Sequence, residues 1–208
     1  MNPGRSGRQK KFKHTPRKNN KLPIAIGLLI IIAVIVAVVY VFALNNPSNS
    51  SSGGTVLLQT SLGNITIQLR DDKPITTSNF KNLIKQGIYD GTIFHRVIAN
   101  FVVQGGQNNA VTVDTIPDEI GSDNQNYRGT VAMAKTNEPD SATSQFFINV
   151  ANNNEIVYGD GTKFDETYTV FGKITSGMDV ADEISYVDTD SNYKPLTDII
   201  LIKAEIIS

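Results

Sequence analysis

The segment of this 208-residue chain best suited to chemistry is 94–106, FHRVIANFVVQGG. It places Arg96, Phe101 and Gln104 in an apolar, β-branched run that is typical of a strand, where residues two apart share a face. A lone guanidinium beside apolar side chains and an amide is an unusual set to gather in one small area. Arginine is always charged and presents several rigid donors, so such a site is suited to stabilising an acceptor held against apolar groups.

The composition excludes several other kinds of chemistry. The chain has no cysteine, which excludes disulfides, a thiol nucleophile and zinc sites built on thiolates. His14 and His95 are the only histidines in the sequence, so a metal site built from several histidines is excluded as well. Gly105-Gly106 lacks the lysine of a phosphate loop and predicts a tight turn. The acidic stretch 160–166 lacks the spacing of an EF-hand, which favours a solvated loop.

Three motifs, FHRVI…FxVQGG at 94–106, GTVAMA at 129–134 and SQFF at 144–147, resemble in order and spacing the cyclophilin family of peptidyl-prolyl cis/trans isomerases. The resemblance covers about three quarters of the chain. It implies an enzyme that needs no metal and no cofactor. The residues that it implies as catalytic are Arg96, Phe101 and Gln104. The residues that it implies for substrate binding are Val102, Ala134, Gln145, Phe147, Phe164 and Tyr168.

The implied reaction suits these residue types. Rotation about a peptide bond meets a barrier of about 18–20 kcal/mol, but before proline the cis and trans forms differ by only about 0.5–1 kcal/mol. An enzyme therefore needs to bind the twisted amide more tightly than either planar form. Twisting localises a lone pair on the proline nitrogen, which Arg96 would stabilise while Phe101 and Phe147 hold the ring. Gln104 and the backbone of Ala134 would hold the flanking chain as an extended strand.

The chain departs from the usual family pattern at several positions. Val102 stands where methionine is common, and Lys135 stands where asparagine is common. Phe164 and Tyr168 fall where many members have leucine and histidine, and the usual tryptophan has no counterpart. The stretch 151–167 is longer and more polar than usual. These changes put cyclosporin sensitivity in question more than they do catalysis.

Each implied role also has a structural alternative. Arg96 could pair with a carboxylate of the core, and Phe101 and Phe147 could be ordinary core residues. Gln104 could tie off a loop. His95 invites a role as general base, but its spacing fits no hydrolase motif, and a lone buried histidine is more often structural.

The apolar pattern predicts a β-rich domain. A helix is expected to begin at Thr76-Thr77-Ser78 and to end at Gln86-Gly87, and a second helix is expected over 179–184. Many short strands with two helices favour a barrel or a sandwich. With the resemblance, we expect a mainly β fold, a closed eight-stranded antiparallel barrel with two helices. The expected strands are 56–60, 65–69, 92–97, 101–104, 130–134, 146–150, 169–174 and 199–206.

The N-terminal quarter predicts a membrane anchor. Residues 1–21 hold eight basic residues and no acidic one, which leaves 11 basic and 20 acidic residues in the rest of the chain. Residues 22–44 are uncharged and long enough to cross a bilayer as one transmembrane helix. The basic arm indicates a cytoplasmic N-terminus, so residues 45–54 form a flexible linker to an extracytoplasmic domain over 55–208. The alternatives are nucleic-acid binding by the arm and cleavage after residues 41–43.

The sequence therefore predicts a single-pass, membrane-anchored isomerase that acts on proline-containing polypeptides outside the cytoplasmic membrane. We expect a monomer with no nucleic-acid partner. One alternative is a tethered module or chaperone that binds proline-containing segments with little catalysis. Another is a scaffold subunit of an envelope assembly that makes its contacts through the 151–167 loop.

Overall fold

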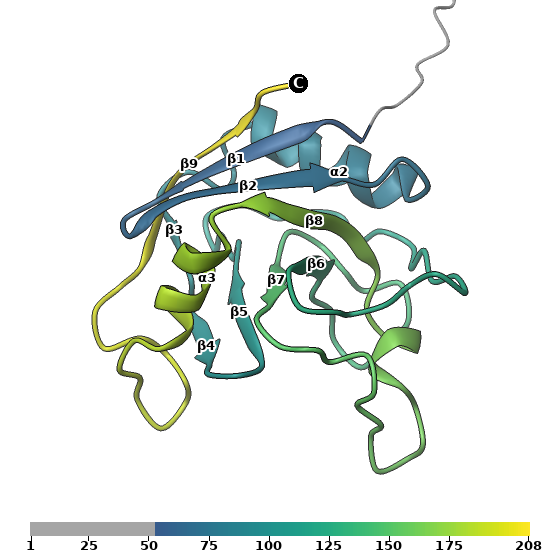
Figure 1. Cartoon of the computed structure of the whole chain (residues 1–208). Coiled ribbons are helices and arrows are strands. Elements are labelled where there is room, and N and C mark those ends of the chain that lie inside the picture. Colours follow the sequence, from purple (N-terminus) through teal and green to yellow (C-terminus); the bar gives the residue numbers. More distant parts are fainter. Residues whose placement is uncertain (1–52) are drawn as a thin grey trace, which may run out of the picture. The chain divides into compact units, whose positions relative to one another are not determined.

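The computed structural model describes residues 53–208, which form one antiparallel sheet of nine strands with two α-helices (Figure 1). The strand order in the sheet is β3-β9-β1-β2-β8-β6-β7-β5-β4. The strands are β1 (Thr55–Thr60), β2 (Gly63–Leu69), β3 (Thr92–Ile93), β4 (Arg96–Ile98), β5 (Val102–Gly105), β6 (Thr130–Met133), β7 (Phe146–Asn149), β8 (Val170–Ser176) and β9 (Ile200–Ile206).

The expected closed, eight-stranded barrel is wrong in one respect, because the sheet is open between β3 and β4. The segment 92–97 was expected to be one strand, but Thr92 and Ile93 pair with β9, whereas Arg96 and the residues after it pair with β5. The chain leaves one ladder and enters the other at Phe94-His95. Both edges of the sheet therefore belong to one short segment, which raises the strand count to nine.

Helix α2 (Pro74–Lys85) begins two residues before the expected start. Pro74 occupies the first turn, where its missing N–H costs little. The carboxylate of Glu119 accepts the backbone N–H groups of Ile75 and Thr76 at 3.1 and 2.8 Å, in place of a side-chain cap. The helix ends as predicted, because Gly87 follows it with φ at 68°.

Helix α3 (Met178–Ser185) extends the expected helix by one residue at each end. It buries Ala181 and Ile184 against the barrel interior, and α2 buries Phe80, Leu83 and Ile84 there. The side chains in the centre of the barrel alternate with outward-facing ones along each strand, as a pleated strand requires. A group of four rings, Phe80, Tyr89, Phe146 and Phe171, fills this interior.

Both ends of the described domain lie at one edge of the barrel (Figure 1). The N–H of Thr55 donates to the carbonyl of Ser208 at 2.8 Å, and the N–H of Ile207 donates to the carbonyl of Thr55 at 2.8 Å. The predicted basic arm 1–21, anchor 22–44 and most of the linker 45–54 lie outside the described residues, so they stay predictions. Within residues 53–208, no helix combines the length and the apolar composition that a bilayer crossing requires.

Candidate active site

The outer face of strands β4, β5, β7 and β6 brings the candidate residues into one row. Arg96 pairs with Gln104, Gln104 pairs with Phe147, and Phe147 pairs with Ala132. Directly paired residues of an antiparallel sheet project to the same face, with side chains close enough to interact. The register of three ladders therefore places a guanidinium, an amide and an aromatic ring side by side.

Alternation explains why this row faces outward. The residues next to it in sequence point into the barrel and are almost fully buried, as for Val97, Val103 and Phe146. Their neighbours Arg96 and Gln104 are half-buried at the surface. The apolar interior thus fixes the register, and the register in turn fixes which side chains share the outer face.

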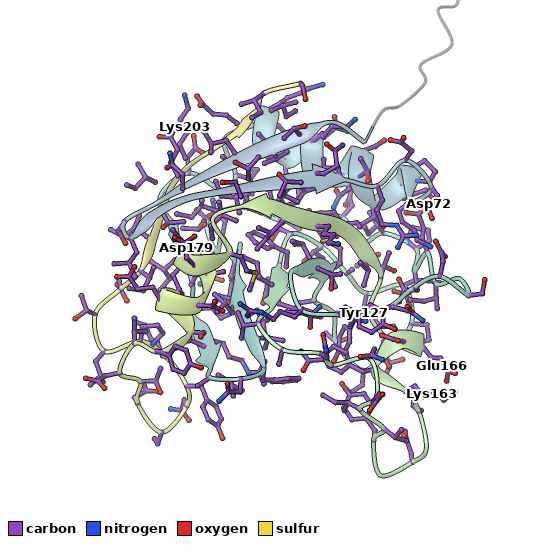
Figure 2. The ribbon with its side chains drawn as sticks, in the orientation of Figure 1. Asp72, Tyr127, Lys163, Glu166, Asp179 and Lys203 are labelled. Atoms are coloured by element: carbon purple, nitrogen blue, oxygen red, sulfur yellow. The ribbon has the colours of Figure 1, made fainter. Side chains whose placement is uncertain are left out.

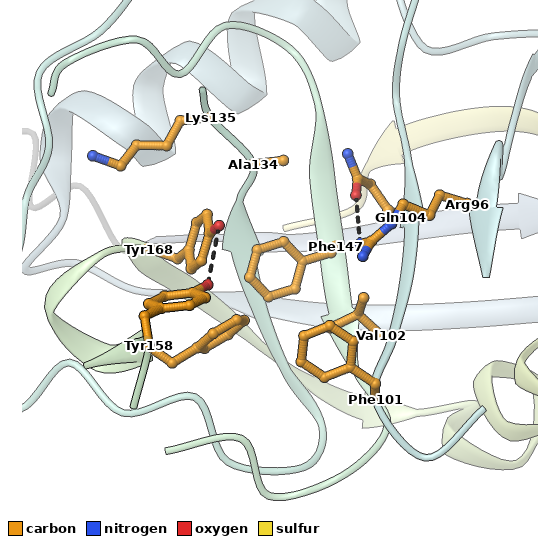
Figure 3. Close-up of a pocket in the computed structure, with 10 residues that line it drawn as sticks. Arg96, Phe101, Val102, Gln104, Ala134, Lys135, Phe147, Tyr158 and Tyr168 are labelled. Carbon is orange, nitrogen blue, oxygen red and sulfur yellow. Dashed lines mark hydrogen bonds between the residues drawn. The ribbon is translucent and has the colours of Figure 1, made fainter. Parts of the chain in front are cut away.

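A pocket of about 290 Å³ lies on this face (Figure 3). Its floor is a small apolar cluster, separate from the barrel interior, that includes Val102, Phe147 and Phe164. The ring of Phe164 lies 5.6 Å from that of Phe101 and 5.8 Å from that of Phe147, measured between centroids. The lining residues are Arg96, Phe101, Val102, Gln104, Ala134, Lys135, Phe147, Tyr158, Phe164 and Tyr168.

A chain of hydrogen bonds holds the polar side of the pocket. The Nη1 of Arg96 donates to the Oε1 of Gln104 at 3.3 Å, and the Nε2 of Gln104 donates to the Oε1 of Gln145 at 3.0 Å. The Cζ of Arg96 lies 5.9 Å from the centroid of the Phe101 ring. Among the described residues, no carboxylate lies within ion-pair distance of Arg96. The alternative of an arginine paired with a core carboxylate is therefore wrong for this part of the chain.

The comparison with protein families decides the family of this fold. A family model described as "Cyclophilin type peptidyl-prolyl cis-trans isomerase/CLD" matches residues 55–206. The chain belongs to this family. Its activity is therefore peptidyl-prolyl cis-trans isomerisation, and it acts on proline-containing peptides.

Relatives of this cyclophilin agree with the family match. A peptidyl-prolyl cis-trans isomerase of Acinetobacter baylyi is 48% identical over 142 residues, 65% of this chain and 74% of that one. Peptidyl-prolyl cis-trans isomerase A of Dickeya dadantii is 44% identical over 77% of this chain and 86% of that one. A crystal structure of a Cryptosporidium parvum cyclophilin, obtained in the presence of the dipeptide Ala-Pro, has a TM-score of 0.64 and 27% identity. It covers 74% of this chain and 99% of that one.

The structure gathers almost all of the predicted site residues. Eight of the nine line the pocket, and only Gln145 does not. Gln145 instead contacts the site through its bond to Gln104. Their catalytic and binding roles stay predictions, but the geometry that those roles require is present.

Two lining residues, Lys135 and Tyr158, were not among the predicted site residues. The Nζ of Lys135 donates to the Oδ2 of Asp118 at 2.6 Å, which anchors the loop that carries Asp118 beside the pocket. Tyr158 lies in the unusually long 151–167 stretch and reaches the pocket rim. The length of that stretch was visible in the sequence, but no periodic pattern indicated which of its residues would turn inward.

The 3₁₀ turn Phe164–Glu166 decides which neighbour enters the pocket of this cyclophilin. Phe164 is buried in the pocket floor, whereas Lys163 forms an exposed ion pair with Glu166 at 3.5 Å (Figure 2). The pocket wall at this point is therefore aromatic and uncharged.

Buried asparagines hold the loops that form the pocket walls. The Nδ2 of Asn153 donates to the carbonyl of Phe101 at 3.0 Å and to the Oδ1 of Asn149 at 2.7 Å. The Nδ2 of Asn124 donates to the carbonyls of Asp165 and Tyr168 at 2.6 and 2.9 Å. Since buried amides are costly unless they are paired, these bonds fix the loops on both sides of the pocket.

His95 lies beside the row of site residues without lining the pocket. Its Nδ1 is buried and has no hydrogen-bond partner among the described residues. Burial lowers the pKa of His95, and the nearby charge of Arg96 lowers it further. A neutral histidine at the bend between β3 and β4 fits a structural role better than a general base.

Proposed function

We propose that the outer-face pocket holds the proline ring of the substrate and that Arg96 accelerates rotation of the bond before it. The single observation that carries this proposal is the row of Arg96, Gln104 and Phe147 beside an apolar floor. The floor suits a pyrrolidine ring, which has no polar group of its own apart from its amide nitrogen. The guanidinium of Arg96 lies at the edge of that floor.

The proposed step is a rotation, with no bond broken or formed. As the amide twists, its nitrogen loses conjugation and becomes a better hydrogen-bond acceptor. The guanidinium of Arg96 donates to this nitrogen more strongly in the twisted form than in either planar form, which lowers the barrier. The apolar wall strengthens that interaction relative to water.

Gln104 and Gln145 position the guanidinium and the peptide. The Oε1 of Gln104 accepts from Arg96, and its amide donates onward to Gln145, so both termini of the Gln104 side chain are occupied. We propose that Phe101, Val102, Phe147 and Phe164 contact the ring. We propose further that the backbone of Ala134, together with Tyr168, holds the flanking chain.

The decisive experiment compares Arg96→Ala and Arg96→Lys with the wild-type full chain on a proline tetrapeptide. Removing one preorganised donor of this kind costs about 100-fold to 1,000-fold in rate. We expect Arg96→Ala to lose about 100-fold in kcat/KM with an unchanged melting temperature. Arg96→Lys keeps the charge but loses the rigid fork, so it should fall between the two.

Arg128→Ala is the matched control. Arg128 lies outside the pocket, in a bidentate pair with Asp182 at 2.6 Å, and surface pairs of this kind contribute at most about 1 kcal/mol. This variant should keep wild-type activity. Full activity in Arg96→Ala would contradict the assigned mechanism.

We propose in addition that the enzyme is tethered to the cytoplasmic membrane by residues 22–44 and isomerises proline bonds in polypeptides folding outside it. The basic arm 1–21 and the uncharged stretch of 23 residues support this orientation. Protease added outside cells with an intact cytoplasmic membrane should digest residues 55–208 and spare a cytoplasmic marker. Protection of the domain until the membrane is lysed would refute the orientation.

A further inference from the structure

A small hairpin at the tip of the 151–167 loop sets the position of Tyr158. Val157 and Lys163 form an antiparallel bridge, and the N–H of Tyr158 donates to the carbonyl of Thr162 at 2.8 Å. The N–H of Gly161 donates to the carbonyl of Tyr158 at 2.9 Å, and Gly161 has φ at 88°, a conformation that glycine adopts readily. Tyr158 is thus held at the base of a closed turn.

The Tyr158 side chain joins the aromatic wall of the pocket from this hairpin. Its ring centroid lies 6.2 Å from that of Phe164, and its hydroxyl lies 3.3 Å from the hydroxyl of Tyr168. The Tyr168 ring in turn packs edge-on against Phe147, with centroids 5.3 Å apart. Tyr158 nonetheless remains 39% exposed, so it borders the pocket and solvent at once.

The two phenols form a polar spot beside the aromatic rings of the wall, in a pocket that Lys135 also lines on this side. They lie on one side of the Phe147 ring, and Arg96 and Gln104 lie on the other (Figure 3). Burial, aided by the bond to Tyr168, raises the pKa of Tyr158, so its phenol carries a proton at neutral pH. Only one hydroxyl donates in the shared bond, which leaves a second hydroxyl proton and several lone pairs for another partner.

We propose that Tyr158 is a specificity-determining residue that contacts the substrate, and that the Tyr158–Tyr168 pair favours a small hydrogen-bonding side chain, such as serine or asparagine, next to the proline. This inference rests on the proposed role of the pocket as the proline site. If the proline ring of the substrate lies on the pocket floor with Arg96 on one side, the substrate residue on the other side contacts the hydroxyls of Tyr158 and Tyr168. An apolar side chain there displaces water from the hydroxyls and returns no hydrogen bond.

The test uses short peptides of the form Ala-X-Pro-Z and measures cis/trans exchange directly by NMR, without a coupling protease. Position X and then position Z are varied between serine and alanine and between asparagine and leucine. The wild-type full chain should show a kcat/KM preference of about threefold to tenfold for the polar residue at one of the two positions, the worth of one hydrogen bond. Tyr158→Phe, which keeps the ring and removes the hydroxyl, should abolish most of that preference.

The control is Tyr127→Phe, because Tyr127 has a similar exposure of 43% and does not line the pocket (Figure 2). The Tyr127→Phe variant should keep the wild-type preference.

Two results would overturn the proposal. One is a wild-type enzyme with equal kcat/KM on the polar and apolar peptides, and the other is a preference that Tyr158→Phe leaves intact. An equal loss of kcat/KM on all peptides in Tyr158→Phe would also contradict it, because the Tyr158 hydroxyl would then only support the pocket wall. Arg96→Ala, assayed on the same peptides, separates the two proposals, because its full activity would refute the proline-site assignment whatever Tyr158→Phe does.

Discussion

Phe146 and Phe147 are adjacent on β7, yet they belong to two differently built regions. Phe146 points into the barrel and contacts the rings of Phe80, Tyr89 and Phe94, which are held by α2 and the segments that follow it. Phe147 points outward and contacts Phe164 and Tyr168.

The difference lies in what holds each set of partners. The barrel interior is fixed by regular elements that bury apolar faces. The pocket walls are loops fixed by amide hydrogen bonds. The strands thus supply the floor and the charged row, whereas polar contacts between loops supply the remaining walls. A site built in this way can change its walls without disturbing the fold.

The sharpest test of this contrast replaces each phenylalanine of the pair. Phe146→Ala should destabilise the domain by about 3–5 kcal/mol, because it opens a cavity in a fully buried ring cluster. That loss is a large fraction of the stability of an ordinary domain, so much of this variant should be unfolded at 37 °C.

Phe147→Ala should cost less stability, about 1–3 kcal/mol, because its ring already borders an open pocket. Its kcat/KM should nevertheless fall, because Phe147 lines the pocket. The kcat/KM of the folded fraction of Phe146→Ala should instead stay near the wild-type value. Urea denaturation combined with the peptide assay measures both quantities. Equal stability losses, with activity lost in proportion, would show that the two faces do not differ as described.

A smaller effect is expected at Asn153, which connects Phe101 to Asn149. Asn153→Ala leaves a buried acceptor of Asn149 without its donor and should cost about 1–3 kcal/mol. Because the Phe101 wall is then less well positioned, KM should rise several-fold with a smaller change in kcat.

Asn154→Ala is the control for this prediction. Asn154 is the next residue in the chain, and its side chain makes no hydrogen bond with the described residues. It should behave as wild type in both assays. A normal KM in Asn153→Ala would mean that the asparagine supports the fold alone.

The smallest effect is expected from a change of pH, which should alter the stability of the domain through His95, at the bend between β3 and β4. Burial lowers the pKa of His95 in the folded chain below its usual value near 6.5. Below that value the unfolded chain binds the proton more readily, so this contribution to stability is complete above pH 6.5 and is lost as pH falls. The melting temperature should therefore drop between pH 7.5 and pH 5.5 by more in wild type than in His95→Gln. An identical drop in both proteins would exclude His95 as its source.

The sequence predicted the site residues better than it predicted the ends of elements. The resemblance implied that Gln104 and Phe147 belong to the site, whereas the run FFIN at 146–149 shows no alternation that could have told a pocket residue from a core residue. The start of α2 was misplaced because Thr76 and Thr77 resemble capping residues, whereas the N–H groups there are capped by Glu119, 43 residues or more along the chain. The break at Phe94-His95 was missed because it depends on which strand each half pairs with.

The resemblance predicted the site residues, and the pocket contains all but Gln145. Tyr158 was not predicted as a site residue. Backbone hydrogen bonds within the hairpin turn position it, and such bonds produce no apolar periodicity in the sequence. The membrane anchor was predicted from composition and lies outside the described residues.

The pairing of Thr55 with the last residues of β9 and beyond has a practical consequence. Since both ends of the domain are joined by one ladder, a short peptide bridge from residue 208 to residue 55 would close the backbone into a ring. New ends could then be opened at the solvent-exposed tip near Gly159, at the far side of the fold. Such a circular permutant would place a fusion partner directly beside the pocket, where it could deliver a chosen polypeptide to the enzyme.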